Sequence, residues 1–304
     1  MSELLNKITR EMNRYSYKFK TVSISHLPEV QEAVARLVRQ GMISEKLCSN
    51  WHFYLDRNTN LPTAKTIFVI AIPQYITRSC FEWQKISYLA DFPPGTFGKG
   101  HESRAREILE AILNAHGYGV MKAHLALKTL AVRSGLAQYG KNNITYVPGM
   151  GSFHRLIAFY SDFPCKDDNW HEVRAMKTCN TCSLCAENCP VQSISTDRFL
   201  IHAENCQAFD KVEKDSSWWI QPDWSNTLVS CMRCQQVCPV NKPYINKIEE
   251  GPFFSESETE LMLNGTPTVN LTTETRNKLD RLTDEELYLT TIRNLRVLLK
   301  SQNL

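Results

Sequence analysis

The sequence lacks both a long hydrophobic run and an excess of charge of one sign. Its longest apolar run, Ile67–Pro73, is far too short to span a bilayer, and residues 1–12 contain no apolar signal segment. The 35 basic and 32 acidic residues nearly balance, so the formal net charge of +3 neither requires nor excludes a nucleic-acid partner. We therefore expect a cytoplasmic protein, kept in a reducing compartment, with no membrane association.

The sequence also lacks internal repeats, apart from two runs of cysteines. These runs belong to one longer cysteine pattern. Eight of the eleven cysteines form it: Cys179-x-x-Cys182-x-x-Cys185-x-x-x-Cys189-Pro190, then a lone Cys206, then Cys231-x-x-Cys234-x-x-x-Cys238-Pro239. This spacing is typical of a module that binds two [4Fe–4S] clusters, each of which needs four thiolates.

In such modules the last cysteine of a run ligates the other cluster. Cluster 1 is therefore expected to use Cys179, Cys182, Cys185 and Cys238. The second run is one ligand short, and Cys206 supplies the missing thiolate. Cluster 2 is accordingly expected to use Cys189, Cys206, Cys231 and Cys234.

Disulfides and zinc are the alternatives for these cysteines. Disulfides fit a reducing compartment poorly, and two zinc ribbons would each need paired C-x-x-C knuckles of similar form. Cys48, Cys80 and Cys165 lie outside the pattern, and we expect them to be ordinary packed or half-exposed cysteines.

The rest of the chain predicts a mixed α/β or α+β fold, because helical and strand patterns alternate. Helices are expected over 27–41, 105–112 and 122–134, and strands over 66–72, 144–147 and 155–160. Three parts follow: an N-terminal α/β domain over 1–165, a ferredoxin-like two-cluster domain over 166–247, and a polar linker with a short helical C-terminus over 248–304.

Two sequence blocks before the cysteines add a second signal. They are Leu-Ala-Val-Arg-Ser-Gly-Leu-Ala-Gln-Tyr-Gly-Lys-Asn at 130–142, and Gly-Ser-Phe at 151–153 followed by Tyr-Ser-Asp-Phe-Pro at 160–164. Together with the eight cysteines, these blocks resemble the epoxyqueuosine reductase family and, more loosely, the reductive dehalogenases. The resemblance implies cobalamin bound between an N-terminal corrinoid-binding domain and the two-cluster domain, with the corrin over cluster 2.

The same resemblance implies which residues contact the corrinoid. Gly140, Lys141, Asn142 and Ser152 would line the pocket, with Met232 in the adjacent loop. The alternative for these positions is structural: a glycine that stops a helix, and a hairpin turn.

The sequence departs from the family at the residue expected to protonate the substrate. An aspartate of the family pattern is replaced by Gly100. His101 and Glu102 are the candidate proton donors in its place, since both residue types serve as general acids. Alternatively, both only begin a helix, where an acid favours the positive end of the dipole. Tyr139 is a further candidate donor, with core packing as its alternative role.

We predict a cobalamin-dependent iron–sulfur oxidoreductase that resembles epoxyqueuosine reductase. A low-potential donor such as ferredoxin or flavodoxin would reduce cluster 1, then cluster 2 and the corrinoid, which reduces an unidentified small-molecule or corrinoid-protein substrate. One alternative is an electron-transfer or corrinoid-reducing partner without substrate chemistry. Another is tRNA epoxyqueuosine reductase proper; since relatives continue into helical repeats and only one helix is expected after the linker, tRNA is the less favoured partner.

Overall fold

The computed structural model describes residues 3–43, 61–94, 99–208, 226–283 and 285–301. It divides into two compact units that alternate along the chain. Unit 1 comprises Met1–Pro73, Lys99–Ser183 and Thr196–Ile201, and unit 2 comprises Gln74–Gly98, Leu184–Ser195 and His202–Leu304. Each of the predicted domains, 1–165, 166–247 and 248–304, is one continuous stretch of sequence, whereas each of these units consists of several stretches. The predicted domain division stays a prediction.

Unit 1 contains a four-stranded antiparallel sheet with the strand order β1-β2-β8-β5. Its strands are β1 (Lys18–Ser23), β2 (Thr66–Pro73), β5 (Val120–Lys122) and β8 (His154–Ser161). The strand predicted from the apolar run is confirmed as β2, and every side chain from Thr66 to Ile72 in it is fully buried. Because successive side chains of a strand point to opposite faces, both faces of this sheet require cover.

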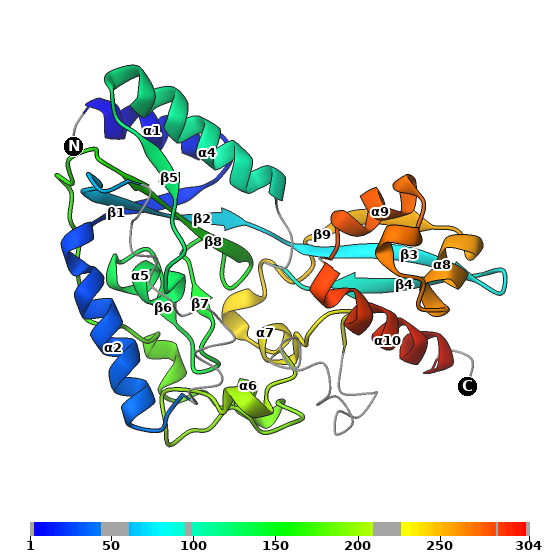
Figure 1. The fold of residues 1–304 in the computed structure, drawn as a ribbon. Helices are drawn as coiled ribbons and strands as arrows, with labels where there is room; N and C mark the ends of the chain where they lie inside the picture. Colours follow the sequence, from blue (N-terminus) through cyan, green and yellow to red (C-terminus); the bar gives the residue numbers. More distant parts are fainter. Residues whose placement is uncertain (1–2, 44–60, 95–98, 209–225, 284, 302–304) are drawn as a thin grey trace. The chain divides into compact units, whose positions relative to one another are not determined.

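Helices provide that cover on each face. Alternate side chains of β2 pack in one cluster with α1 (Glu3–Asn13) and α4 (Lys99–Leu113), and Figure 1 shows these two helices lying side by side. The other side chains of β2 pack with α2 (Leu27–Arg39) and α5 (Leu127–Arg133). Each buried large aliphatic or aromatic side chain stabilises the fold by about 2 kcal/mol. Because side chains of β2 belong to both clusters, this strand is the centre of the core of unit 1.

The helix predicted over 122–134 begins later than expected. Residues Val120–Lys122 form β5 instead, since they pair with β8 at the edge of the sheet, and α5 starts at Leu127. The predicted end is confirmed, because Gly135 adopts φ 74°, a left-handed conformation that glycine accepts without strain.

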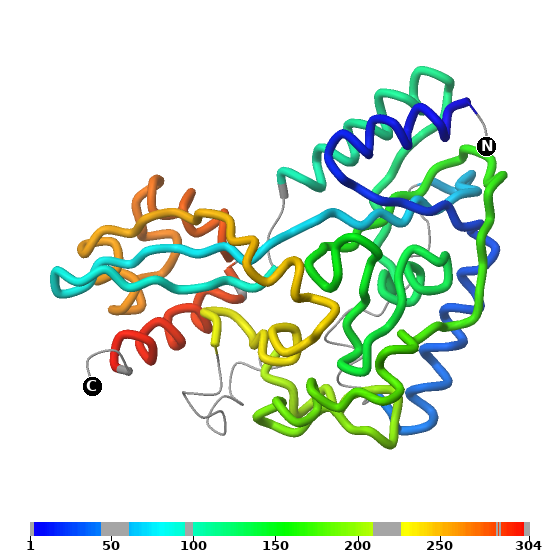
Figure 2. The backbone as a smooth tube through the Cα atoms, turned by 180° about the vertical axis from the view of Figure 1, so that it is seen from behind, coloured from blue at the N-terminus to red at the C-terminus, as the bar shows by residue number. Residues whose placement is uncertain are grey.

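Unit 2 contains a three-stranded sheet with the order β4-β3-β9. Its strands are β3 (Ile76–Trp83), β4 (Ile86–Phe92) and β9 (Ile248–Phe254). Both views show β9 alongside β3 (Figures 1 and 2), and the two strands are parallel. Residues 248–254 were expected to be linker because of Gly251 and Pro252. They form a strand at the sheet edge instead, where proline is tolerated.

Three helices cover one face of this second sheet. They are α8 (Glu256–Leu263), α9 (Thr273–Asp280) and α10 (Glu285–Ser301), and their apolar side chains share one cluster with those of β3, β4 and β9. The rings of Phe81 and Phe254 stack within it at 4.7 Å between centroids. No helix that the structure describes is long and apolar enough to cross a membrane.

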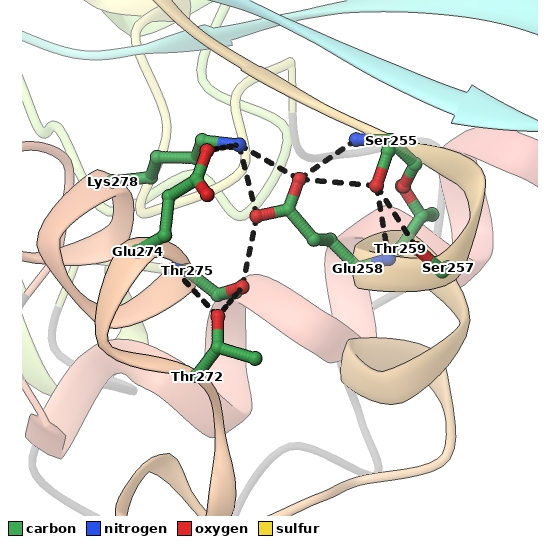
Figure 3. Close-up of polar contacts among 8 residues, drawn as sticks. All are labelled: Ser255, Ser257, Glu258, Thr259, Thr272, Glu274, Thr275 and Lys278. Atoms are coloured by element: carbon green, nitrogen blue, oxygen red, sulfur yellow. Dashed lines mark hydrogen bonds and ion pairs between the residues drawn. The ribbon is translucent and has the colours of Figure 1, made fainter.

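Within unit 2, a polar network connects α8 to α9 (Figure 3). Ser255 caps α8 in a reciprocal capping box with Glu258. The Glu258 carboxylate also accepts hydrogen bonds from Lys278 Nζ at 2.8 and 2.9 Å and from Thr275 Oγ1 at 2.8 Å. Burial raises the pKa of Glu258, but its hydrogen bonds from Lys278, the Ser255 N–H and Thr275 outweigh burial and hold the pKa below the ordinary value.

Candidate iron–sulfur and proton-donor site

Short helical turns carry the cysteines of unit 2. Cys185 lies in α6 (Leu184–Glu187), Cys234 lies in α7 (Arg233–Gln236), and these two helices pack against each other. Cys206 directly follows a 3-10 turn, η4 (Ala203–Asn205). The terminal cysteine of each run, Cys189 or Cys238, precedes a proline, which prevents the helical turn from continuing.

Three of the four cysteines assigned to cluster 2 are neighbours within unit 2. Burial and, to a smaller extent, the nearby sulfurs of Cys206 and Cys189 raise the pKa of the Cys231 thiol to about 11. Thiols that perturb one another electrostatically lie close together. A [4Fe–4S] cluster requires four thiolates, and Cys189, Cys206 and Cys231 are three of the four donors assigned to cluster 2, so their chemistry fits such a group.

Backbone N–H groups point at two of these sulfurs. Ser193 N donates to Cys189 Sγ at 3.3 Å, and Arg233 N donates to Cys231 Sγ at 3.5 Å. The Ser193 carbonyl in turn accepts from His202 N at 2.7 Å, which ties the Cys189 loop to the segment before Cys206. Hydrogen bonds to cluster sulfurs are one of the means by which proteins set a reduction potential.

The cysteines assigned to cluster 1 are divided between the units. Cys179 and Cys182 belong to unit 1, whereas Cys185 and Cys238 belong to unit 2. Cys179 ends a 3-10 turn, η3 (Lys177–Cys179), and its carbonyl accepts from Cys182 N at 3.4 Å. The assignment of the eight cysteines to two clusters stays a prediction, and Cys48 lies outside the described residues.

Gly140, Lys141 and Asn142 lie in the turn between β6 (Gln138–Tyr139) and β7 (Thr145–Tyr146) of unit 1. Their side chains contact the protein itself. Asn142 is buried and donates from Nδ2 to the Tyr146 hydroxyl at 3.1 Å, and Lys141 Nζ donates to the Cys182 carbonyl at 2.6 Å. A Cβ on Gly140 would lie 2.5 Å from Tyr146 Cε2, so the loop packing itself requires this glycine.

The other two predicted corrinoid contacts are buried as well. Ser152 lies just before β8 in unit 1 and is 4% exposed, and Met232 lies in unit 2 with no exposed surface. The buried side chains of Ser152 and Met232 present no exposed groups to a corrinoid. A corrinoid pocket formed by the five residues stays a prediction.

Both candidate proton donors are positioned by neighbours within unit 1. His101 and Glu102 lie in the first turn of α4. Nδ1 of His101 is 2.9 Å from the hydroxyl of the buried Tyr17. The carboxylate of Glu102 forms ion pairs with Lys122 and, at 3.7 Å, with Arg155. The helix-start alternative and the proton-donor role are both compatible with this geometry.

Tyr139, the further candidate donor, is 8% exposed, and its hydroxyl lies 3.4 Å from Thr129 Oγ1. Burial raises its pKa. Its ring meets that of Phe199 edge to face, with centroids 5.3 Å apart. These contacts favour the packing role.

Asn143 is a functional candidate that the sequence did not single out. It adopts φ 56°, a left-handed conformation that asparagine tolerates better than most residues. Its Nδ2 donates to the Phe199 carbonyl and its Oδ1 accepts from Ile201 N, both at 2.7 Å. The only signal in the sequence is a second asparagine after Gly-Lys-Asn, a residue type common in turns.

The comparisons with known proteins agree with the cysteine pattern. The model of a 4Fe-4S double cluster binding domain matches residues 178–241. An epoxyqueuosine reductase of Xanthomonas campestris is 29% identical over 161 residues, 51% of this chain and 43% of that protein. A tetrachloroethene reductive dehalogenase of Desulfitobacterium hafniense is 28% identical over 120 residues, 37% of this chain and 22% of that protein. The matched region thus spans less than half the length of these relatives.

Solved structures define the class of fold. The epoxyqueuosine reductase of Streptococcus thermophilus aligns with a TM-score of 0.66 and 16% identity, covering 99% of this chain and 82% of that one. An epoxyqueuosine reductase with a tRNA-Tyr epoxyqueuosine-modified stem loop aligns with a TM-score of 0.63 and 17% identity, covering 98% and 81%. The fold is that of epoxyqueuosine reductases, and it includes a double-cluster domain. This fold agrees with the resemblance that the motifs predicted.

Proposed function

We propose that this protein is an iron–sulfur oxidoreductase that passes single electrons through two [4Fe–4S] clusters to a substrate. The observation that carries the proposal is the match of residues 178–241 to a double-cluster domain, since this segment contains all eight cysteines of the pattern. A low-potential donor such as ferredoxin or flavodoxin would supply the electrons at cluster 1. Relatives named as reductases support the same reaction class.

The mechanism that we propose assigns three tasks to the chain's own residues. Eight thiolates would hold the clusters, and the N–H groups of Ser193 and Arg233, which donate to Cys189 Sγ and Cys231 Sγ, would stabilise negative charge on these sulfurs. A reduction that adds electrons to a substrate also needs a proton for each negative charge formed. His101 or Glu102 would deliver that proton, with Tyr17 orienting His101.

Cobalamin is the further cofactor that the motif resemblance implies, and when bound it would supply a strongly reducing, nucleophilic metal. Gly140, Lys141, Asn142, Ser152 and Met232 are its proposed neighbours. Because their side chains are buried or bonded within the chain, backbone groups and loop shape would have to hold it.

Anaerobic purification tests the cofactors directly. We expect about eight iron atoms per chain, a low-temperature EPR signal on reduction with dithionite, and cobalt in the same preparation if a corrinoid is bound. Zinc in place of iron would refute the oxidoreductase proposal. Iron without cobalt, before and after reconstitution with hydroxocobalamin, would refute only the corrinoid.

An electron carrier without substrate chemistry is the first alternative. A chain that binds no corrinoid but passes electrons from reduced flavodoxin to a separate corrinoid protein would establish it. Viologen oxidation that depends on an added substrate, with no second protein present, would exclude it.

A tRNA epoxyqueuosine reductase is the second alternative, and one observation favours it. The structural neighbour solved with an epoxyqueuosine-modified tRNA stem loop covers 98% of this chain, including its C-terminal helices. Conversion of epoxyqueuosine in tRNA by the reduced holoprotein, read by mass spectrometry of digested nucleosides, tests this reading. Absence of conversion, together with no tRNA gel shift at low salt, would exclude it.

A further inference from the structure

The turn that contains Gly140–Asn143 and the residue before it contact unit 1 at three places. These places lie before, within and after the first cysteine run. The first is the hydrogen bond of 2.6 Å from Lys141 Nζ to the backbone carbonyl of Cys182, which bridges 41 positions of sequence. A bond from an ammonium to a carbonyl is charge-assisted and stronger than one between neutral groups. The lysine therefore holds the main chain directly at a predicted cluster 1 ligand.

The second contact holds a segment that follows the first cysteine run in the sequence. Asn143 bonds both the Phe199 carbonyl and Ile201 N at 2.7 Å, so its amide fixes two peptide groups of the 196–201 segment. A single side chain that bonds both a donor and an acceptor of one segment holds the backbone of that segment in place.

The third contact is made by the backbone before the turn. Tyr139 N donates to the Arg174 carbonyl and its own carbonyl accepts from Met176 N, each at 2.8 Å. The Met176 carbonyl then accepts from Cys179 N at 3.0 Å. The 139–143 segment thus holds the chain before Cys179, at Cys182 and after the first cysteine run, all within unit 1.

Lys141 differs from the other contacts because it carries a full positive charge. The Lys141 side chain is half-buried, and within the described chain no carboxylate forms an ion pair with it. Adding one electron to a cubane held by four thiolates raises its negative charge by one, and no bond to carbon or proton transfer is involved. A fixed cation beside the loop stabilises that reduced form, in an environment where charges interact more strongly than in water.

We propose that Lys141 positions the Cys179–Cys182 loop and raises the reduction potential of the cluster bound by Cys182, and so helps it to accept electrons from the external donor. The inference rests on the two clusters of the proposed function. It gives Lys141 a task that needs no contact with a corrinoid.

Potentiometric EPR titration of the anaerobic holoprotein tests the proposal. Lys141→Gln keeps a hydrogen-bond donor and loses the charge, whereas Lys141→Arg keeps both. In Lys141→Gln we expect one of the two reduction steps to move to a more negative potential and the other to stay. At the wild-type midpoint of that step, the ratio of reduced to oxidised cluster should fall about tenfold, equivalent to about 59 mV for one electron. Lys141→Arg should restore the ratio to within a few-fold.

Lys128→Gln is the matched control. Lys128 Nζ bonds the Asn143 carbonyl of the same turn at 3.3 Å, at an exposed position, and we expect both potentials to be unchanged. The shift should persist in a Cys206→Ser background, in which only the Cys182 cluster is expected to remain.

Other outcomes would overturn the proposal. These are unchanged potentials in Lys141→Gln, an equal shift of both steps, an equal shift in the glutamine and arginine variants, or loss of iron from both variants. Iron loss from Lys141→Gln alone, with wild-type potentials in Lys141→Arg, supports the positioning role. A wild-type protein without clusters would instead refute the proposed function, which its iron content reveals independently.

Discussion

Tyr17 and His101 lie 84 residues apart in the sequence, and their side chains meet at 2.9 Å between the phenol oxygen and Nδ1. Burial raises the pKa of Tyr17, so the phenol keeps its proton. This contact fixes the ring orientation of the candidate proton donor, which the sequence had placed only by analogy with a family pattern.

The pair gives a first prediction. If His101 is the acid, His101→Ala should reduce turnover at least about a hundredfold, as expected for loss of general acid catalysis. Tyr17→Phe should reduce it less, because it removes orientation and not the acid. Substrate-dependent oxidation of reduced viologen measures both, and iron content should stay at the wild-type level.

Exposed His124 supplies the control, since His124→Ala should leave turnover unchanged. Glu102→Gln is the matched test of the other candidate. Full turnover in both His101→Ala and Glu102→Gln would return the two residues to a helix-start role.

The ligand assignment gives a second prediction. Cys206→Ser should lose about half of the bound iron, because one cubane loses a thiolate while the other keeps its four. Iron analysis and EPR spin counting measure the loss. Cys165→Ser should keep all of it, since Cys165 lies outside the pattern and burial, aided by Asp168, raises its thiol pKa to about 11. Loss of both clusters, or of neither, from Cys206→Ser would contradict the assignment.

The packing of the Gly140 turn gives a third prediction. Gly140→Ala should lower the free energy of unfolding by about 1–3 kcal/mol, the usual cost of overpacking a buried site. The added Cβ would lie 2.5 Å from the buried ring of Tyr146 and 2.7 Å from Asn142 Oδ1. Anaerobic urea denaturation measures the change.

Gly100→Ala is its control. Among the described residues beyond its chain neighbours and its own helix backbone, no atom lies within 4 Å of a Cβ at that position in α4, so we expect the substitution to be neutral or to stabilise by up to about 1 kcal/mol. Equal effects of the two substitutions would show that the Gly140 turn adapts to a side chain.

Short sequence patterns predicted the helices and strands that depend mainly on neighbouring residues. The run at β2 is rich in β-branched residues, and the glycine after α5 lies where the helix ends. The β3–β4 hairpin was missed because its turn is Gln84-Lys85, both with positive φ, and not the Asn-Gly or Asp-Gly that marks such turns. Strand β9 was read as linker, although pairing with β3 outweighs the low strand propensity of glycine and proline.

The candidate site likewise has one part that local sequence patterns predict and another part that depends on long-range contacts. Cysteine spacing is local, so the double-cluster segment could be predicted, and a double-cluster domain matches it over residues 178–241. The bond from Lys141 to Cys182 and the amide of Asn143 join segments 41 and 56–58 positions apart, and no periodicity or spacing encodes such a contact. The sequence therefore pointed to the Gly-Lys-Asn turn through resemblance, while its contacts with the cluster segments required the fold.

A buried histidine gives the last prediction, on pH. Nδ1 of His154 lies 3.1 Å from the Gly151 carbonyl and Nε2 lies 3.0 Å from Thr145 Oγ1. A carbonyl can only accept, so the neutral ring carries its proton on Nδ1 and accepts from the threonine hydroxyl. Burial lowers the pKa of His154 from 6.5 to about 4.

The unfolded chain therefore binds more protons than the folded chain between about pH 4 and pH 6.5, and the stability due to neutral His154 is lost as the pH falls through this window. From pH 8 to pH 5 the free energy of unfolding should fall by about 2 kcal/mol from this residue alone. Anaerobic urea denaturation at several pH values measures it. His154→Gln, which does not titrate, should be less stable at pH 8 and should lose less on acidification. An equally steep loss in that variant would assign the acid sensitivity to other groups.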